Sequence, residues 1–287
     1  MSAPEGLLLL DKPSGPTSHD LVVQARRALG QPRIGHTGTL DPPASGLLVL
    51  VLGRATRLAR FIPSAPKTYE GTIRLGCVTS TDDLWGEVLR REEGDPPAPG
   101  QVLAAAQAFR GSLRQVPPAV SARKVGGKRM YALARRGHPV EAAPTAVEVS
   151  RFDLAPGEDG WTWRFTAEVS AGTYIRSLAR DLGAALGCGG TLASLRRTAI
   201  GPFRVEAAQI EPGLDAVVPL SSLPLDLPPV ALAAEAARRF AAGVLLPWDA
   251  PDAGEVAVRD PAGELLGIGR LAGGSLRPLV VLAPCPA

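Results

Sequence analysis

Two short, wholly apolar runs place the strongest limit on the fold of this chain. Residues 6–10 and 47–52 contain no polar side chain and are too short for buried helices of ordinary length, so each predicts a strand covered on both faces. Residues 68–75 instead alternate apolar and polar side chains, which is typical of a strand with one covered face. Residues 147–154 and 161–169 predict a further pair of strands.

Helices are expected between these strands. Thr17 followed by Asp20 fits a capping box at the start of a helix that Gly30 would end. A second amphipathic helix is predicted over residues 173–186, with Thr173 as its N-cap. Because strands and helices mix without regular alternation, the predicted fold class is α+β.

The composition shifts near residues 222–229, which read S-L-P-L-D-L-P-P. Beyond this point we expect a helix over residues 231–242 and then several short strands. The chain therefore divides into a large unit, residues 1–225, and a small β-rich unit, residues 228–287.

Charge is unevenly distributed along the chain. Residues 1–204 hold 26 Lys/Arg and 18 Asp/Glu, a net charge of +8, whereas residues 205–287 hold 5 and 10, a net charge of −5. Residues 96–140 contain no acid but include Arg110, Arg114, Arg123, Lys124, Lys128, Arg129, Arg135 and Arg136. This block suits a polyanion such as nucleic acid, and a solvated basic face is the alternative.

The three cysteines are Cys77, Cys188 and Cys285, which are far apart in sequence and form no paired motif. They indicate a reducing, cytoplasmic setting without a disulfide framework. The three histidines have no metal-ligand spacing. The apolar residues near the N-terminus are too few for a signal peptide or a membrane span.

One carboxylate stands out in a loop rich in glycine and proline. Residues 31–46 are expected to form this loop, which leads into the apolar run 47–52 and contains Asp41. Pro42 restricts the backbone of Asp41 to extended conformations, so the side chain could be presented rigidly. The alternative is that the Asp-Pro-Pro sequence only makes a turn.

Several motifs together resemble the bacterial tRNA pseudouridine-55 synthases. The resemblance covers roughly residues 6–200, and its motifs occur in the family's order. They are L-L-L-D-K-P-S-G-P-T-S from Leu8, G-H-T-G-T-L-D-P-P-A-S-G from Gly35, K-T-Y from Lys67, S-A-R-K-V-G-G-K-R-M-Y-A-L-A-R-R-G from Ser121, A-G-T-Y-I-R from Ala171, D-L-G-A-A-L-G-C-G-G from Asp181, and L-R-R from Leu195.

This resemblance implies a mixed, largely antiparallel sheet with flanking helices, and the breaking and re-forming of a uridine glycosidic bond without metal or other cofactor. Asp41 would be the nucleophile, attacking either the uracil ring or the ribose. Arg176 would pair with Asp41 and orient it. Tyr69, the third expected catalytic residue, would stack on the uracil face and could take part in proton transfer.

The resemblance also implies a set of residues that bind RNA. His36 would fill the space that a flipped base leaves, and Leu195 would line the uracil pocket. A basic excursion over residues 112–145 would fold over the RNA. Residues 228–287 resemble a PUA domain, a small RNA-binding unit. The full set of expected substrate-binding residues is Lys12, Gly35, His36, Thr37, Tyr174, Leu195, Arg123, Lys124, Lys128 and Arg129.

The expected partner is the T stem-loop of tRNA, bound by a monomer that needs no protein partner and no membrane. One alternative is a related synthase that acts on another uridine or works with a guide RNA. Another is a tRNA-binding or folding chaperone without catalysis. A glycoside hydrolase would need a second carboxylate near Asp41, and the motifs give none.

The chain departs from the family pattern beside the predicted site. Where the family usually has several acids, residues 79–86 read T-S-T-D-D-L-W-G, so Ser80 and Trp85 occupy positions that are often acidic. Val120 stands where an aromatic residue is common. These changes concern RNA contacts and leave Asp41, Tyr69 and Arg176 intact.

Overall fold

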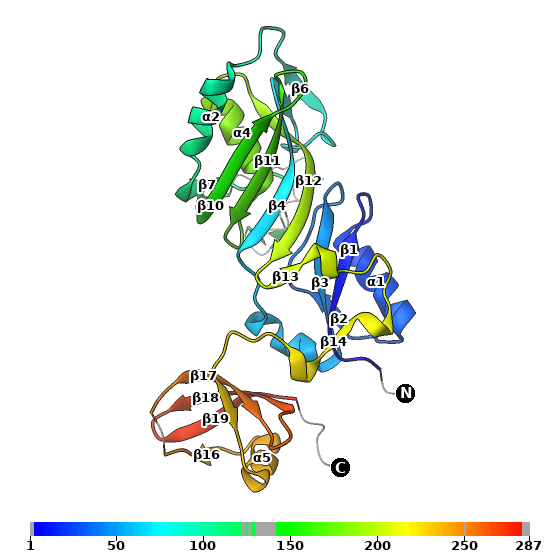
Figure 1. Ribbon diagram of the computed structural model, residues 1–287, viewed down its shortest axis with the longest axis vertical. Coiled ribbons are helices and arrows are strands. Elements are labelled where there is room, and N and C mark those ends of the chain that lie inside the picture. The colour runs from blue at the N-terminus through cyan, green and yellow to red at the C-terminus, as the bar shows by residue number, and fades with distance from the viewer. Residues whose placement is uncertain (1–2, 122–123, 126–127, 130–141, 250, 283–287) are drawn as a thin grey trace.

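The protein is described by a computed structural model that covers residues 3–121, 124–125, 128–129, 142–249 and 251–282. The molecule is elongated, with a β-rich C-terminal unit at one end and a larger unit that contains the N-terminus (Figure 1). No helix in these ranges is long and apolar enough to cross a membrane.

A mixed sheet is the framework of the larger unit, and ten strands of the described chain belong to it. Its main path runs in the spatial order β14 (Val217–Pro219), β1 (Gly6–Lys12), β3 (Ser45–Leu52), β12 (Gly190–Ile200), β4 (Lys67–Leu75), β11 (Thr162–Val169), β10 (Thr145–Pro156) and β7 (Gly111–Gln115). Two short strands, β2 (Ile34–His36) and β13 (Phe203–Arg204), pair with β3 and β12. All these pairs are antiparallel except β3 with β12.

Burial along the strands follows the sequence pattern. Nearly every residue of β1 and β3 is buried, because α1 (Ser18–Leu29) covers one face and the 3-10 helix η1 (Gly53–Phe61) lies on the other. In β4, Tyr69, Ile73 and Leu75 are buried in a core cluster with residues of α2 (Pro99–Gln107) and α4 (Ile175–Ala185). These two helices lie on one side of the sheet (Figure 1).

The predicted fold class, α+β with a largely antiparallel sheet, is confirmed. The cap of α1 is also confirmed, because Thr17 and Asp20 form a capping box and Gly30 is left-handed with a φ of 59°. The predicted cap of α4 is wrong. Tyr174 is the N-cap residue, and the hydroxyl of Thr173 instead lies 3.2 Å from that of Ser170.

Smaller elements complete the larger unit. They are the hairpin of β5 (Cys77–Thr79) with β6 (Val88–Arg91), the hairpin of β8 (Lys124–Val125) with β9 (Lys128–Arg129), and the 3-10 turns η2 (Val205–Ala207), η3 (Leu214–Ala216) and η4 (Leu220–Ser222).

The C-terminal unit has its own sheet and one helix. Its strands lie in the order β15 (Pro229–Ala231), β17 (Gly254–Arg259), β18 (Leu265–Ala272), β19 (Ser275–Val281) and β16 (Leu246–Pro247), and its helix is α5 (Ala234–Ala241).

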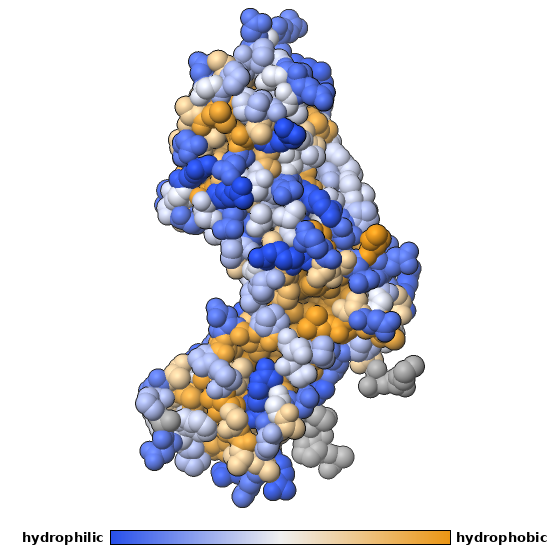
Figure 2. Space-filling model, viewed as in Figure 1, coloured by the Kyte–Doolittle hydropathy of each residue, from blue (hydrophilic) through white to orange (hydrophobic). Residues whose placement is uncertain are grey.

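One hydrophobic cluster continues from the larger unit into the C-terminal unit. It includes Leu7 of β1 and Leu58 of η1 together with Ile268 and Leu282. The guanidinium of Arg57 also donates to the carbonyl of Val281. Hydrophobic surface is visible on both sides of the waist where the units meet (Figure 2). The two sheets therefore pack against each other through η1.

Candidate active site

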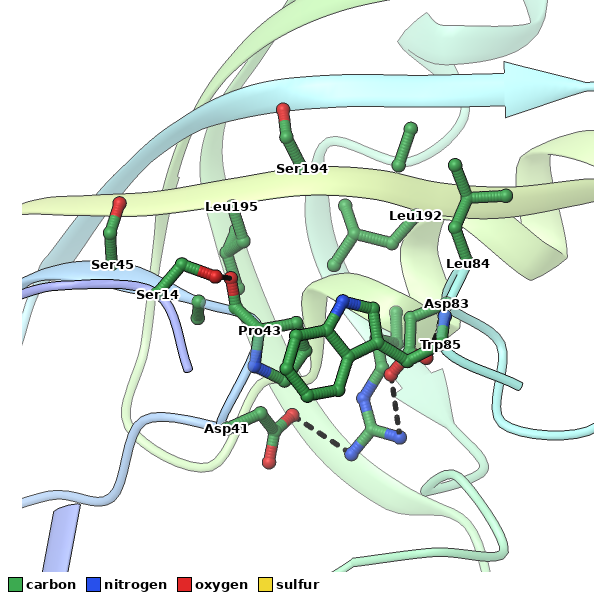
Figure 3. A pocket seen from close by; sticks show the side chains of 13 residues that line it. Ser14, Asp41, Pro43, Ser45, Asp83, Leu84, Trp85, Leu192, Ser194 and Leu195 are labelled. Atoms are coloured by element: carbon green, nitrogen blue, oxygen red, sulfur yellow. Dashed lines mark hydrogen bonds and ion pairs between the residues drawn. The ribbon is translucent and has the colours of Figure 1, made fainter. Parts of the chain in front are cut away.

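Asp41 lies in a cavity of about 270 Å³ at the centre of the larger unit. The segment after β1, the loop before β3, the middle of β12, the turn between β5 and β6, and the start of α4 all meet there. The side chains are drawn in Figure 3 and come from Ser14, Asp41, Pro43, Ala44, Ser45, Asp83, Leu84, Trp85, Arg176, Leu192, Ala193, Ser194 and Leu195.

An ion pair joins Asp41 to Arg176, as the resemblance implied. Arg176 Nη2 lies 2.9 Å from Asp41 Oδ2, and the side chains are 6% and 41% exposed, respectively. The same guanidinium donates to the carbonyls of Thr81 at 2.8 Å and Val120 at 2.9 Å. A buried cation thus fixes one carboxylate oxygen while the carboxylate stays accessible from the cavity.

A second carboxylate, Asp83, faces the same guanidinium and was not predicted as a site residue. Its Oδ2 lies 3.6 Å from Arg176 Nη1, and its side chain is only 11% exposed. The other oxygen accepts hydrogen bonds from Thr81 Oγ1 at 2.6 Å and from the backbone N–H of Trp85 at 3.1 Å. The two consecutive aspartates in T-S-T-D-D-L-W-G were the signal for it. Asp83 is thus a second carboxylate beside the guanidinium that pairs with Asp41, and the motifs of the resemblance did not point to it.

Every carbonyl of residues 38–44, the loop that carries Asp41, accepts a hydrogen bond. Two fully buried cations, Lys12 and Arg197, supply many of the donors. Arg197 donates to the carbonyls of Gly38 at 3.1 Å and Thr39 at 3.3 Å, and Lys12 Nζ donates to those of Pro42 at 3.1 Å and Ala44 at 2.7 Å. Hydroxyl groups serve two more carbonyls, since Ser18 Oγ donates to Leu40 and Ser14 Oγ to Pro43, both at 3.0 Å. Backbone N–H groups complete the set, from Ala44 to the carbonyl of Asp41 at 3.0 Å and from Gly15 to that of Pro42 at 2.8 Å. The backbone of the loop that carries Asp41 is therefore fixed by hydrogen bonds from the segment around Lys12 and from Arg197 of β12.

Lys12 has a different position from that expected of a substrate ligand. Its ammonium donates to the carbonyls of Pro13, Pro42 and Ala44 and has no solvent exposure. Burial, opposed by the charge of Asp41, lowers the pKa of Lys12 to about 8. The residue is thus placed to hold the Asp41 loop rather than to reach RNA.

We expect kcat to fall as the pH rises through about 8, the pKa of Lys12. The neutral amine keeps two N–H groups for three carbonyls, and it no longer attracts the Asp41 carboxylate. The measurement is a pH–rate profile at saturating RNA for the wild type and for Lys12→Met. The variant should be slower throughout and lack this alkaline decline. A decline of equal size in Lys12→Met would assign it to another group, such as the uracil itself.

Gly35, His36 and Thr37 come just before the Asp41 loop. Residues 31–46 were expected to be a loop, but Ile34–His36 form strand β2 against β3. Burial, followed by the charge of Arg197, holds the pKa of His36 below its ordinary value. Within the described ranges, His36 Nδ1 and Thr37 Oγ1 are buried without a hydrogen-bond partner. Such groups are costly to leave unpaired, so a ligand could satisfy them.

Of the remaining predicted residues, one lines the cavity, two lie in elements next to it, and the others belong to the basic segment. Leu195 lines the cavity with Asp41. Tyr69 is buried in the core cluster with Leu195 and is outside the cavity lining. Tyr174 is the N-cap residue of α4, shortly before Arg176. Its backbone N–H donates to Gln115 Oε1 at 2.8 Å, and its carbonyl accepts from Gln115 Nε2 at 3.1 Å.

The basic segment begins close to the site. Arg123 lies outside the described residues. Lys124, Lys128 and Arg129 belong to the hairpin of β8 and β9, of which the backbone is described. This hairpin begins at Lys124, a few positions after Val120, whose carbonyl accepts a hydrogen bond from Arg176.

Comparisons with known proteins identify the family of this chain. A family profile described as "TruB family pseudouridylate synthase (N terminal domain)" matches residues 26–175, and one described as "tRNA pseudouridylate synthase B C-terminal domain" matches residues 176–218. The tRNA pseudouridine synthase B of Synechococcus elongatus is 47% identical over 290 residues, which cover 97% of this chain and 98% of that protein. That of Thermobifida fusca is 44% identical over 97% of this chain and 99% of that protein.

Solved structures show the same fold. A chain from "Crystal Structure of a Cbf5-Nop10-Gar1 Complex" aligns with a TM-score of 0.72 and 27% identity, over 98% of this chain and 86% of that chain. A chain from "Structure of H/ACA RNP bound to a substrate RNA containing 2'-deoxyuridine" aligns with a TM-score of 0.70 and 26% identity, over 97% of this chain and 85% of that chain.

The mixed sheet that surrounds this cavity is thus the fold of a pseudouridine synthase, an isomerase. Both family profiles and the near full-length relatives point the same way. The chain belongs to the TruB family of pseudouridylate synthases.

Proposed function

We propose that this protein converts the T-loop uridine of tRNA to pseudouridine, with Asp41 as the nucleophile. The observation that carries the proposal is the accessible Asp41 carboxylate, ion-paired to buried Arg176 in a cavity. The substrate follows from relatives named tRNA pseudouridine synthase B that align over nearly the full chain.

The reaction needs no external atoms or electrons. The bond between ribose C1′ and uracil N1 breaks, a bond from C1′ to C5 forms, the proton leaves C5, and N1 gains a proton. Asp41 can form a transient covalent bond to either the uracil ring or the ribose, which splits a difficult step into easier ones. The product is an isomer of the substrate, so no redox or group-transfer cofactor is implied.

The target base must leave the folded RNA loop to reach Asp41. The cavity has apolar walls at Leu192 and Leu195, against which a uracil ring can pack. Such walls exclude water and strengthen the interaction between the charges of Asp41 and Arg176. We infer that His36 fills the space that the flipped base vacates. Tyr69 packs in the same core cluster as Leu192 and Leu195, so in this proposal it supports the wall against which the uracil packs.

The proposed function is tested with an unmodified tRNA transcript and with a transcript whose T-loop uridine is replaced by cytidine. Pseudouridine is mapped at single-nucleotide resolution after incubation with wild-type protein. The expected result is modification at the T-loop uridine of the first transcript alone. Modification at another uridine would overturn the substrate assignment. RNA binding without any pseudouridine would favour a folding chaperone.

We expect replacement of Arg123, Lys124, Lys128 and Arg129 by Gln to weaken tRNA binding and flatten its salt dependence. Each lost phosphate contact reduces the slope of log K against log salt by roughly 0.7–0.9. The measurement is the dissociation constant at several salt concentrations. Replacement of Arg151 and Arg164, exposed arginines of the sheet, is the control for lost charge alone. Equal slopes for wild type and the fourfold variant would move the RNA surface elsewhere.

The C-terminal unit, residues 228–287, is proposed to be a PUA-like module that adds a second RNA contact. Residues 205–287 have a net charge of −5, so this contact is local rather than a broad phosphate surface. The protein is proposed to act in the cytoplasm as a monomer without a protein partner.

A further inference from the structure

Exposed apolar side chains are concentrated in the turn between β5 and β6 and at the start of β6. In the described chain, nine large hydrophobic side chains are exposed to solvent, and four of them fall between residues 84 and 89. Leu84 is 46% and Trp85 63% exposed, and both line the cavity with Asp41. A concentration of exposed apolar surface beside a substrate pocket marks a contact surface.

The turn that carries Trp85 is braced. The N–H of Leu84 donates to the carbonyl of Leu192 at 3.0 Å, and the N–H of Leu192 donates to the carbonyl of Asp82 at 3.0 Å. This exchange fixes the turn to β12. Gly86 is also tightly enclosed, because a Cβ there would lie 2.3 Å from Thr81 Oγ1.

The same turn is tied to the charged groups of the site. The N–H of Trp85 donates to Asp83 Oδ1 at 3.1 Å, and Asp83 pairs through its other oxygen with Arg176 at 3.6 Å. Arg176 in turn holds Asp41 at 2.9 Å. The backbone of Trp85 is therefore positioned relative to the nucleophile through two ion pairs and one hydrogen bond.

The indole is presented outward rather than used in the core. In Figure 3 its ring lies in front of Pro43 and above Asp41, and an exposure of 63% puts this lining residue at the mouth of the cavity. Trp85 belongs to none of the hydrophobic core clusters of the described residues. An exposed indole has a large flat face that can stack on an unpaired base.

We propose that Trp85 is a stacking platform for the base of a nucleotide next to the target uridine. The inference rests on the proposed function and adds a residue that contacts substrate RNA. When the target base enters the cavity, its neighbour in the loop loses a stacking partner. The target uracil must reach Asp41 within the cavity, so the indole at the mouth is left for the adjoining base.

RNA is the occupant that the surroundings of Trp85 favour. The indole is continuous with the cavity that receives the nucleotide, which Ser14, Ser45 and Ser194 also line. A base that stacks there remains attached to the target by a single phosphodiester link. A protein partner would instead have to cover the entrance that the RNA needs.

The first test compares Trp85→Ala, Trp85→Phe and Leu89→Ala in pseudouridine formation on the tRNA transcript. Loss of one base–aromatic stack should lower kcat/KM by roughly 5- to 150-fold in Trp85→Ala. Trp85→Phe should keep most of the activity. Leu89 is the matched control because it has the same 63% exposure but does not line the cavity. Unchanged kcat/KM in Trp85→Ala would overturn the proposal.

The second test uses transcripts with an abasic site immediately 5′ or 3′ of the target uridine. At one of these positions, wild type should lose activity by about the factor that Trp85→Ala loses on the intact transcript. Trp85→Ala should lose little more on that abasic transcript, because both changes remove the same contact. Fully additive losses, or no loss for wild type at either position, would overturn the proposal. Failure of wild type to modify the intact transcript would instead overturn the proposed function.

Discussion

Replacement of Asp41 by Asn is expected to abolish pseudouridine formation and to leave tRNA affinity nearly unchanged. The amide is close in shape to the carboxylate but is not a nucleophile, so kcat should fall on the order of 10⁴-fold or more. The affinity should persist because the RNA is held over a much larger surface than this side chain. Release of tritium from C5 of labelled uridine gives the rate, and equilibrium binding gives the affinity.

Asp83→Asn is the informative comparison for this experiment. Asp83 faces the same guanidinium but is much less accessible than Asp41. The Asp83→Asn substitution should therefore change the rate only through the position and charge of Arg176, because Asp41 can still form its covalent bond. Near-normal turnover by Asp41→Asn would show that the nucleophile has been assigned to the wrong residue.

Replacement of Arg176 by Lys is expected to have the second-largest effect. The guanidinium bonds two carbonyls and faces two carboxylates at once, and one ammonium cannot reproduce that planar arrangement. We expect kcat to fall on the order of 100-fold or more. The unsatisfied buried carbonyls should also destabilise the fold by about 1–3 kcal/mol. Single-turnover rates and denaturant unfolding measure the two effects separately.

Arg180→Lys controls for the loss of a guanidinium on the same helix. Arg180 also pairs with two acids, Asp82 and Asp181, and donates to the carbonyl of Val116, but it does not line the cavity. It should lose stability with little change in the single-turnover rate. If Arg180→Lys slowed catalysis as much as Arg176→Lys, the effect would be structural rather than specific to Asp41.

Local sequence signals predicted much of the framework. The apolar runs became the buried strands β1 and β3, and the alternating segment became β4. The cap of α1 was predictable because both of its partners lie within three residues of each other. The pairing of Asp41 with Arg176 was expected from the family resemblance alone, since no local pattern links residues so far apart.

Contacts between distant segments explain what was missed. Asp83 and Trp85 reach the cavity because their turn exchanges backbone hydrogen bonds with Leu192, which is more than a hundred positions away. The inward position of the Lys12 ammonium likewise depends on carbonyls of the distant Asp41 loop. His36 was expected in a loop because glycine and proline surround it, but pairing with β3 extends its backbone.

The apolar cluster shared by the two units has a geometric consequence for the RNA. Leu58 of η1 packs in one cluster with Ile268 and Leu282, so the units cannot move apart without exposing apolar surface to water. With the C-terminal unit bound to RNA as proposed, its distance from Asp41 is fixed. An RNA stem that is one base pair longer or shorter would bring its loop to the wrong distance and rotation. On this proposal, the length of the RNA stem would affect modification although no base of the stem is contacted.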